Sequence, residues 1–316
     1  MTAVPLPSRA AALPAAAPAR ARESGWQRTL RRFRRSPLSV LGLVIVAGFV
    51  LLALAAPYLA HPTERDAYMI PHDGYASDPR APGPGHPFGT TEGQFDLFYG
   101  VVWGARTAFL VALTVGAIGV GIALVLGSLS GYYGGWLDEA VMRVTDIFLA
   151  FPGLILAVVI VAVLGQSVRN AVIAIAVVQW PTYTRLLRAE FLRVRDMEYV
   201  QAARAIGGRD LTVIGRHVIP NTVYPILILA SLDMGGVVTT FAALSFLGLG
   251  APPGYADWGQ LINLSHNWIL GTSGDPFKFW YSLVVPGAAI FLFVLGWNLL
   301  GDAFRDIFDP RQHGSR

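Results

Sequence analysis

The residues that could do chemistry in this chain are few and scattered. The chain has no cysteine, which excludes disulfides and thiolate metal sites. No pair of its histidines has metal-ligand spacing; they are His61, His72, His86, His217, His266 and His313. The only lysine, Lys278, lies in Phe-Lys-Phe, whereas a phosphate-binding P-loop requires Gly-Lys-Ser/Thr. The sequence therefore predicts no metal or cofactor site, and any ATP-driven activity would need another chain to hydrolyse ATP.

Other catalytic patterns are also missing from the sequence. We find no nucleophile–base pair, no HExxH motif and no paired carboxylates at a membrane surface, so a membrane-bound enzyme is not supported. One carboxylate stands out, because Asp233 lies inside the apolar stretch ILILASLDMGGVV. An ionisable residue at membrane depth is a functional candidate by default. It could bind a charged peptide amino terminus in a pathway, or form a structural hydrogen bond near Gly235–Gly236.

Composition indicates that the elements holding these residues are membrane helices. The 316 residues are 54% hydrophobic and 14% charged, against about 25% charged in an ordinary soluble chain. The apolar residues form blocks long enough to cross a bilayer as helices. We therefore expect an all-α membrane protein with six transmembrane helices. Their expected positions are 37–60, 107–130, 147–166, 169–187, 222–248 and 279–301.

The placement of arginine predicts the orientation of these helices. Arginines cluster at 28–35 and recur through the connection 188–221, whereas the connection after the first helix is richer in acids. Cytoplasmic segments carry the excess of basic residues. We therefore expect both termini and 188–221 in the cytoplasm, with a disordered tail at 1–25 and the permease domain at 26–316. Because the basic cluster abuts an apolar segment, we interpret it as a topology signal and expect no nucleic-acid partner.

The cytoplasmic segment DMEYVQAARAIGGRDLTVIGRHVIPN predicts two short helices. The first covers Met197–Ile206 and ends at Gly207–Gly208, because glycine accepts the left-handed conformation after a helix. Pro220 is expected to end the second. The apolar residues that align on a face are Tyr199, Val200, Ala203 and Ile206 in the first helix, and Leu211, Ile214 and Val218 in the second. Such helices could enter a groove on a partner protein or rest on lipid headgroups.

At this point the sequence resembles a known family. QAARAIGG…HVIPN is similar to the EAA loop of binding-protein-dependent ABC import permeases. That loop reads Glu-Ala-Ala, three residues, glycine, then nine residues to a hydrophobic-x-Leu-Pro end. The matching positions here are Gln201, Ala202, Ala203, Gly207, His217, Ile219 and Pro220. Gln201 stands in place of the glutamate, which keeps a hydrogen-bonding side chain but loses its charge.

Further segments resemble the C-type subunit of the dipeptide/oligopeptide/nickel permease group. The similar stretches are 86–109, 131–152, 243–262 and 297–311, and the resemblance covers roughly 26–311. Gln94 and Phe95 depart from the family's usual Gly-Arg, and Phe241 stands where a glutamate is common. The Gly248–Trp258 stretch and the loop after it are expected outside, where they contact the binding protein or form part of an outer gate. Its tryptophans are expected to be interfacial aromatics, namely Trp258, Trp268 and Trp280.

The resemblance implies a type I ABC importer permease fold with a cytoplasmic coupling helix around Gln201–Gly207. That helix would dock into a cleft of one of two cytoplasmic ABC ATPases, which bind ATP and Mg²⁺. The residues expected at the contact are Gln201, Ala202, Ala203, Arg204, Gly207, His217 and Pro220. Arg204 could pair with an acidic residue of the ATPase or face solvent. The pore would form with a second, similar permease.

The resemblance also implies the partners and the place of the protein. A periplasmic or lipid-anchored solute-binding protein would deliver short peptides to this multi-pass protein of a bacterial or archaeal inner membrane. Nickel chelates, glutathione and oligosaccharides are alternative cargoes in the same class. A proton- or ion-coupled secondary transporter is the alternative from another class. It would show several intramembrane ionisable residues or internal repeats, and only Asp233 lies at depth here.

Overall fold

The computed structural model describes residue 33 and residues 36–308, apart from 75, 77, 269–274 and 276. The expected tail at 1–25 and the arginines at 28–35 lie outside these residues. Throughout the described part the regular structure is helical, as predicted. Its elements are α2 Pro37–Leu59, α3 Leu97–Tyr133, α4 Gly135–Leu149, α5 Gly153–Leu164, α6 Val168–Arg195, α7 Glu198–Ala205, α8 Asp210–Val213, η1 Ile214–Val218, α9 Ile219–Phe246, α10 Trp258–Asn263, η2 His266–Trp268 and α11 Trp280–Phe308.

Several of these helices are long and apolar enough to cross a membrane. Within the described residues this holds for α2, α3, α11 and the continuous run 210–246 that ends with α9. The pair α4 and α5 passes the same test together, although the two are bent by 88°. The 28 residues of α6 would also reach across a bilayer, but its C-terminal half carries arginines that lower its hydropathy. Six crossings therefore stay a prediction.

Two predicted helices differ from the observed ones. The stretch 147–166 is divided between α4 and α5, because Pro152 has no N–H to continue a helix and keeps Phe151 out of the helical conformation. The helix predicted from residue 107 begins earlier, at Leu97. The Asp96 side chain caps it by accepting a hydrogen bond from the Tyr99 N–H at 2.8 Å. Arg106, which precedes the predicted helix, therefore lies within α3.

Small residues bring α3 close to α6. A Cβ added at Gly131 would lie 2.5 Å from the Phe191 Cβ, and one added at Gly119 would lie 2.6 Å from the Tyr183 ring. Gly127 approaches the α6 backbone in the same way. These glycines repeat at spacings of four or eight residues, so they lie on one helix face, as in small-xxx-small packing between membrane helices. By contrast, Gly121, another glycine of this segment, has open space beside it.

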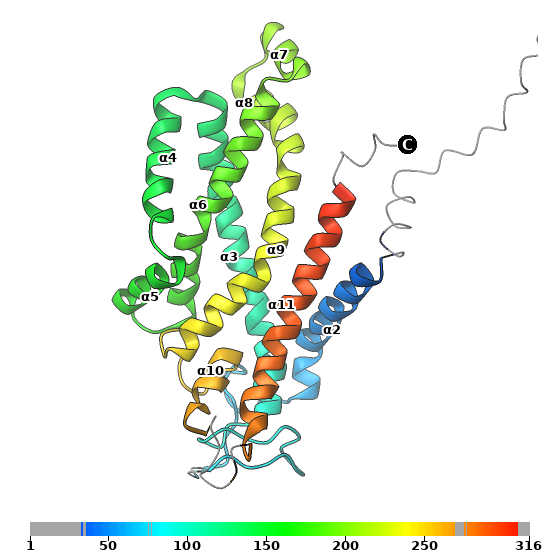
Figure 1. Ribbon diagram of the computed structural model, residues 1–316, viewed down its shortest axis with the longest axis vertical. Coiled ribbons are helices and arrows are strands. Elements are labelled where there is room, and N and C mark those ends of the chain that lie inside the picture. Colours follow the sequence, from blue (N-terminus) through cyan, green and yellow to red (C-terminus); the bar gives the residue numbers. More distant parts are fainter. Residues whose placement is uncertain are drawn as a thin grey trace, which may run out of the picture.

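The long α3 runs past three buried apolar clusters. The cluster at its start joins α2, α10 and α11, and the middle cluster joins α5, α6 and the last turns of α9. The third cluster joins the end of α3 with α6, α7, α8, η1 and the start of α9. Figure 1 shows α7 at the same end of the molecule as the last turn of α11, whereas α10 and the loop after α2 lie at the opposite end.

Candidate functional site

The short helix α7 forms the tip of the molecule (Figure 1). It covers Glu198–Ala205, inside the predicted Met197–Ile206. Gly207 ends it with a φ of +84°, the left-handed conformation that only glycine adopts without strain. The next amide, that of Gly208, donates to the Ala203 carbonyl at 3.0 Å. The paired glycines therefore close the helix as the sequence predicted, with their N–H groups on its last carbonyls.

The apolar residues of this segment divide into an inner and an outer set. Val200 is fully buried in the third cluster, and Ala203 packs against the same cluster. The outer set faces away, since the exposed fractions are 42% for Tyr199, 87% for Ile206 and 80% for Leu211. The predicted single apolar face is thus corrected by the structure. One part anchors α7 to the protein, and the other leaves an apolar surface, which we call the tip patch.

The second short helix is not a separate element. The chain runs from α8 through the π-helical turn η1 directly into α9, and Pro220 sits in the first turn of α9. The prediction that Pro220 ends a helix is therefore wrong. A π turn shifts the hydrogen bonding to i→i+5, and the Ile219 N–H accordingly reaches the Ile214 carbonyl. The Asn221 side chain donates to the His217 carbonyl at 2.7 Å, which satisfies a group near the proline.

Tyr132, at the end of α3, holds the segment in place. The guanidinium of Arg204 lies 4.4 Å from the centre of the Tyr132 ring, and its Nε donates to the Tyr132 hydroxyl at 3.2 Å. The same hydroxyl donates to the Asp210 carboxylate at 2.8 Å. Arg204 thus has a partner within its own chain while its side chain stays exposed. Both flanks of Gly207–Gly208 are therefore fastened to α3.

The predicted contact residues fall into two groups. Gln201, Ala202, Arg204 and Gly207 lie exposed at the tip, where Gln201 Nε2 donates to the Asp196 carbonyl at 3.1 Å. Ala203 is half-buried behind them. The structure does not bring His217 and Pro220 to the tip, because His217 lies in η1 and Pro220 in the first turn of α9. The EAA-like pattern therefore includes residues exposed at the tip and residues in the helical segment that leads into α9.

Ion pairs between α4 and α6 were not predicted from the sequence. Arg188 binds Asp138 through two bonds of 2.5 and 2.6 Å, and Ser130 of α3 donates to the same carboxylate. Arg185 pairs with Asp146, two turns further along α4. Bidentate arginine–carboxylate pairs fix geometry as well as charge. The available signal was two acids eight residues apart facing two arginines three residues apart, each pair on one helix face.

Asp233 of α9 faces α6. Its carboxylate accepts a hydrogen bond from Gln179 Nε2 at 2.8 Å, and Tyr183, one turn further along α6, lies beside it. The expected bond near Gly235–Gly236 is replaced by this contact between helices. Gly235 instead packs against Val294 of α11. Asp233 remains partly exposed, and the bond from Gln179 reaches one of its two carboxylate oxygens.

The opposite end of α9 leads into a buried polar site. Asp257 is 5% exposed and caps α10, accepting from the Gln260 N–H at 2.9 Å. Burial raises the pKa of this carboxyl from 3.8 to about 6, although several backbone amides oppose the shift. Trp258 is 1% exposed and donates to the Val101 carbonyl, so the prediction of an interfacial residue is wrong for it. Trp280 is 56% exposed, as an interfacial aromatic would be.

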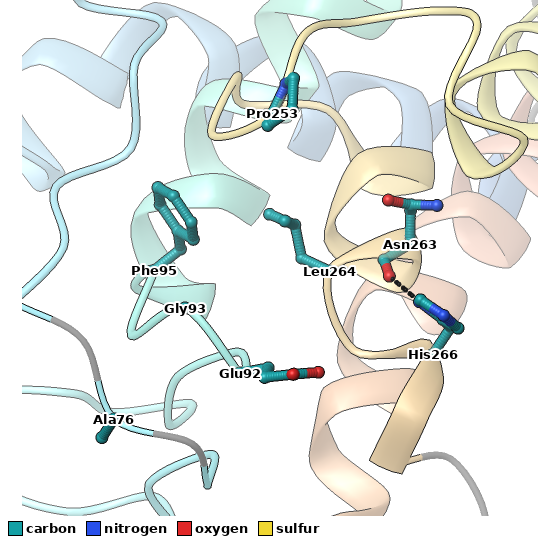
Figure 2. A pocket seen from close by; sticks show the side chains of 8 residues that line it. All are labelled: Ala76, Glu92, Gly93, Phe95, Pro253, Asn263, Leu264 and His266. Carbon is teal, nitrogen blue, oxygen red and sulfur yellow. Dashed lines mark hydrogen bonds between the residues drawn. The ribbon is translucent and has the colours of Figure 1, made fainter.

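A cavity of about 490 Å³ lies at this same end. Figure 2 shows Phe95 and Leu264 facing it from opposite sides, with Glu92 directed toward His266. The cavity joins the loop after α2 to the segment around α10. Phe95 is one of the positions where the sequence departs from the family, so an apolar ring lines this space where an arginine is usual. No motif in either segment predicted that the two would meet.

The sequence of this chain is similar to those of several known transport proteins. The chain is 36% identical over 292 residues to the dipeptide transport system permease protein DppC of Alkalihalophilus pseudofirmus, covering 91% of this chain and 90% of that protein. It is 39% identical over 285 residues to the probable D,D-dipeptide transport system permease protein DdpC of Escherichia coli, covering 89% and 90%. It is also 35% identical over 292 residues to the glutathione transport system permease protein GsiD of Pectobacterium atrosepticum, covering 90% and 91%.

The fold agrees with these relatives. A chain of the methionine ABC transporter MetNI in an inward-facing conformation superposes with a TM-score of 0.52 at 18% identity, covering 67% of this chain and 98% of that one. Residues 24–82 match the N-terminal transmembrane domain of oligopeptide transport permease C. Residues 123–314 match the binding-protein-dependent transport system inner membrane component. The chain therefore belongs to this family of inner membrane components and is a permease subunit of an ABC importer.

Proposed function

We propose that the tip patch on α7 is the surface through which a separate ABC ATPase drives this permease. The tip patch carries this proposal, because Tyr199, Ile206 and Leu211 stay exposed while their neighbour Val200 is buried. A short amphipathic helix with small residues on its flank fits a groove on a partner protein. Ala202 and Gly207 supply that flank. In this proposal ATP and Mg²⁺ bind to the ATPase chains and not to the permease.

The packing behind α7 supports a role for this helix in transmitting movement to the long helices of the bundle. Val200 shares one buried cluster with Phe191 of α6, Val218 of η1 and Ile226 of α9, and Tyr132 connects α3 to the same cluster. A force on α7 would therefore reach α3, α6 and α9 through side chains in direct contact, since packed interiors transmit strain. Closure of the ATPases on ATP would bias the bundle between inward- and outward-facing states as a rigid-body movement.

The cargo we propose is a short peptide. The relatives named for dipeptide transport support a peptide cargo, and the relatives named for glutathione support a closely related tripeptide thiol. The pathway would form between this chain and a second, similar permease, with two ATPases below and a solute-binding protein above. Six crossings, with both termini and α7 in the cytoplasm, complete this arrangement. The cavity beside Phe95 would then lie on the face to which the binding protein delivers.

Asp233 is the residue in the membrane region best suited to meet a cationic peptide amino terminus. It is partly exposed, and Gln179 occupies only one of its oxygens. Asp233→Asn keeps a hydrogen bond to Gln179 but removes the charge. We expect slower uptake of peptides with a free amine, while an N-acetylated peptide is unaffected. Equal uptake of both peptides in the variant and the wild type would leave only the structural role.

Loss of the ATPase from the purified complex tests the proposed docking surface. Ile206→Glu places a charge in the tip patch, and because Ile206 is 87% exposed the permease should still fold. We expect the ATPase to dissociate during purification and nucleotide-driven uptake to fall at least about tenfold. The matched control is Trp136→Ser, since Trp136 is 81% exposed on α4, outside the tip patch. Full retention of the ATPase on the Ile206→Glu permease would disprove docking there.

The cargo is tested separately. The importer can be purified with its solute-binding protein, and the ligands that accompany it identified by mass spectrometry. We expect peptides of two to five residues. Glutathione, a nickel chelate or an oligosaccharide as the sole ligand would refute the peptide assignment but leave the docking surface intact. Uptake that survives an ATPase knockout and collapses with the proton gradient would refute both.

A further inference from the structure

A second surface feature lies on the side of the bundle formed by α2, α3 and α11. There the three helices leave a groove of about 360 Å³. Apolar side chains form almost the whole of its wall. They include Val46, Val50, Leu54, Phe109, Leu113 and Trp297. In Figure 1, α2 lies at the edge of the bundle opposite α5.

One cation, Arg106, lines this apolar groove. Its guanidinium lies 5.0 Å from the centre of the Trp103 ring and remains partly exposed. Across the described residues, no carboxylate forms an ion pair with it. An unpaired arginine within a membrane helix is costly unless it reaches an anion or water. The groove therefore joins an apolar wall to a cation that needs an anionic partner.

The depth of Arg106 follows from its neighbours. Trp103 Nε1 donates to the carbonyl of Ala60, the residue that follows α2, at 2.9 Å. Arg106 is three residues further along α3, which is about 4.5 Å deeper. Tyr68 and Tyr99 pack against Trp103, and this contact lies beside the end of α2, a helix long and apolar enough to cross a membrane. The guanidinium is thus close to the boundary between lipid headgroups and acyl chains.

We propose that the groove binds an anionic phospholipid, with its phosphate on Arg106 and one acyl chain along α2 and α3. A guanidinium presents a planar set of donors that binds two phosphate oxygens at once. The cation–π contact with Trp103 helps to hold the guanidinium at the groove. The lipid holds α2 against α3 and α11. The positive charge of Arg106 favours an anionic occupant over a peptide, and its depth in the membrane favours a lipid over a soluble anion.

Native mass spectrometry of the whole importer tests the phosphate contact. Delipidated complex is titrated with phosphatidylglycerol, and the lipid concentration at half occupancy is measured. We expect Arg106→Gln to raise it about tenfold, the loss expected for one charge-assisted hydrogen bond, and Arg106→Lys to raise it less. Arg80→Gln is the control, because Arg80 lies in the outer loop and pairs with Asp73. Equal titrations of wild type and Arg106→Gln would overturn the proposal.

Photo-crosslinking identifies the occupant directly. Leu54 is 68% exposed on the wall of the groove, so replacing it with p-benzoylphenylalanine should preserve the fold. In membranes that contain phosphatidylglycerol we expect a crosslinked product whose added mass is that of this lipid. The same replacement at Val163, 82% exposed on α5, should give no preference for phosphatidylglycerol over phosphatidylcholine. A crosslink from position 54 to the second permease would overturn the proposal.

Discussion

The two ends of α9 are built on opposite plans. At one end, the chain before α9 forms α7 and exposes apolar side chains such as Ile206 and Leu211. At the other end, the chain after α9 forms α10 and buries Trp258, Gln260 and the carboxyl of Asp257. The first end is fastened to α3 through Tyr132 and exposes apolar side chains, whereas the second buries polar and aromatic side chains beside a cavity of about 490 Å³. An exposed apolar surface of this kind is typical of an interaction site, whereas the buried residues at the α10 end contribute to the stability of the fold.

The glycines of the two ends sharpen this comparison, with the largest effect expected at Gly259 of α10. A Cβ there would lie 2.5 Å from the Ala242 Cα, a backbone atom that cannot rotate away. We expect Gly259→Ala to lower the free energy of unfolding by about 3 kcal/mol, measured by thermal unfolding in nanodiscs. An unchanged unfolding midpoint would show that α10 and α9 are not packed as closely as described.

The buried carboxyl of Asp257 should make the stability of the α10 end sensitive to pH. Its pKa is raised to about 6 in the folded protein from 3.8, so the folded state holds the proton more tightly. The resulting stabilisation is complete below about pH 3.8 and is lost as the pH rises through about 6, a change of roughly 3 kcal/mol. Asp257→Asn keeps the cap on α10 without a titrating group. Thermal unfolding from pH 4 to 7 should become flatter in this variant.

The control for that experiment is Asp66→Asn in the loop after α2. Asp66 also accepts a backbone hydrogen bond, from the Tyr68 N–H at 2.9 Å, but its bond is exposed. This variant should keep the pH dependence of the wild type. If Asp257→Asn and the wild type lose stability equally between pH 4 and 7, the buried carboxyl is not the source.

At the tip, a substitution of Gly207 is expected to lower stability by less, and the cause is backbone strain instead of close packing. Gly207 has open space around it, but its φ of +84° strains any other residue. We expect Gly207→Ala to cost roughly 1–2 kcal/mol locally, with hydrogen exchange of α7 amides accelerated and α10 amides unchanged. The reverse pattern would mean that the tip is not an independently strained turn. Gly215→Ala is the control, since it has open space and no such φ.

The smallest effect on stability is predicted for Ile206→Ser in the tip patch. The side chain is 87% exposed, so the unfolding free energy of the permease alone should change by less than about 0.5 kcal/mol. Thermal unfolding without ATPase measures this. A large destabilisation would show that the tip patch belongs to the permease core, and the contrast between the two ends would fail.

Prediction from the sequence succeeded where local signals agreed. The first helix was predicted at 37–60 and observed at Pro37–Leu59, because Ser36 caps it, Pro37 opens it and an uncharged apolar run follows. The end of α7 at Gly207 was predicted for the same kind of reason, a residue type matched to one backbone conformation. The resemblance to a family predicted more than these local signals did, because four signatures in register indicated an ABC importer permease.

The sequence was insufficient where distant segments decide the outcome. Pro220 is a helix breaker by local rules, yet the π turn and Asn221 accommodate it within a continuous helix. Trp258 suits a membrane interface by type, but its burial against Phe49 and Phe293 depends on α2 and α11. The Arg188–Asp138 pair joins residues fifty positions apart. None of these contacts has a signal within one segment.

The absence of native cysteine allows a direct test of ATPase docking on α7. Ile206→Cys introduces a unique thiol in the tip patch, which is labelled with a maleimide in the assembled importer and again after the ATPases are stripped away. We predict protection in the assembly and rapid labelling after stripping, while Trp136→Cys labels equally in both states. Equal labelling of Ile206→Cys with and without ATPase, in a preparation that still transports, would contradict docking at α7.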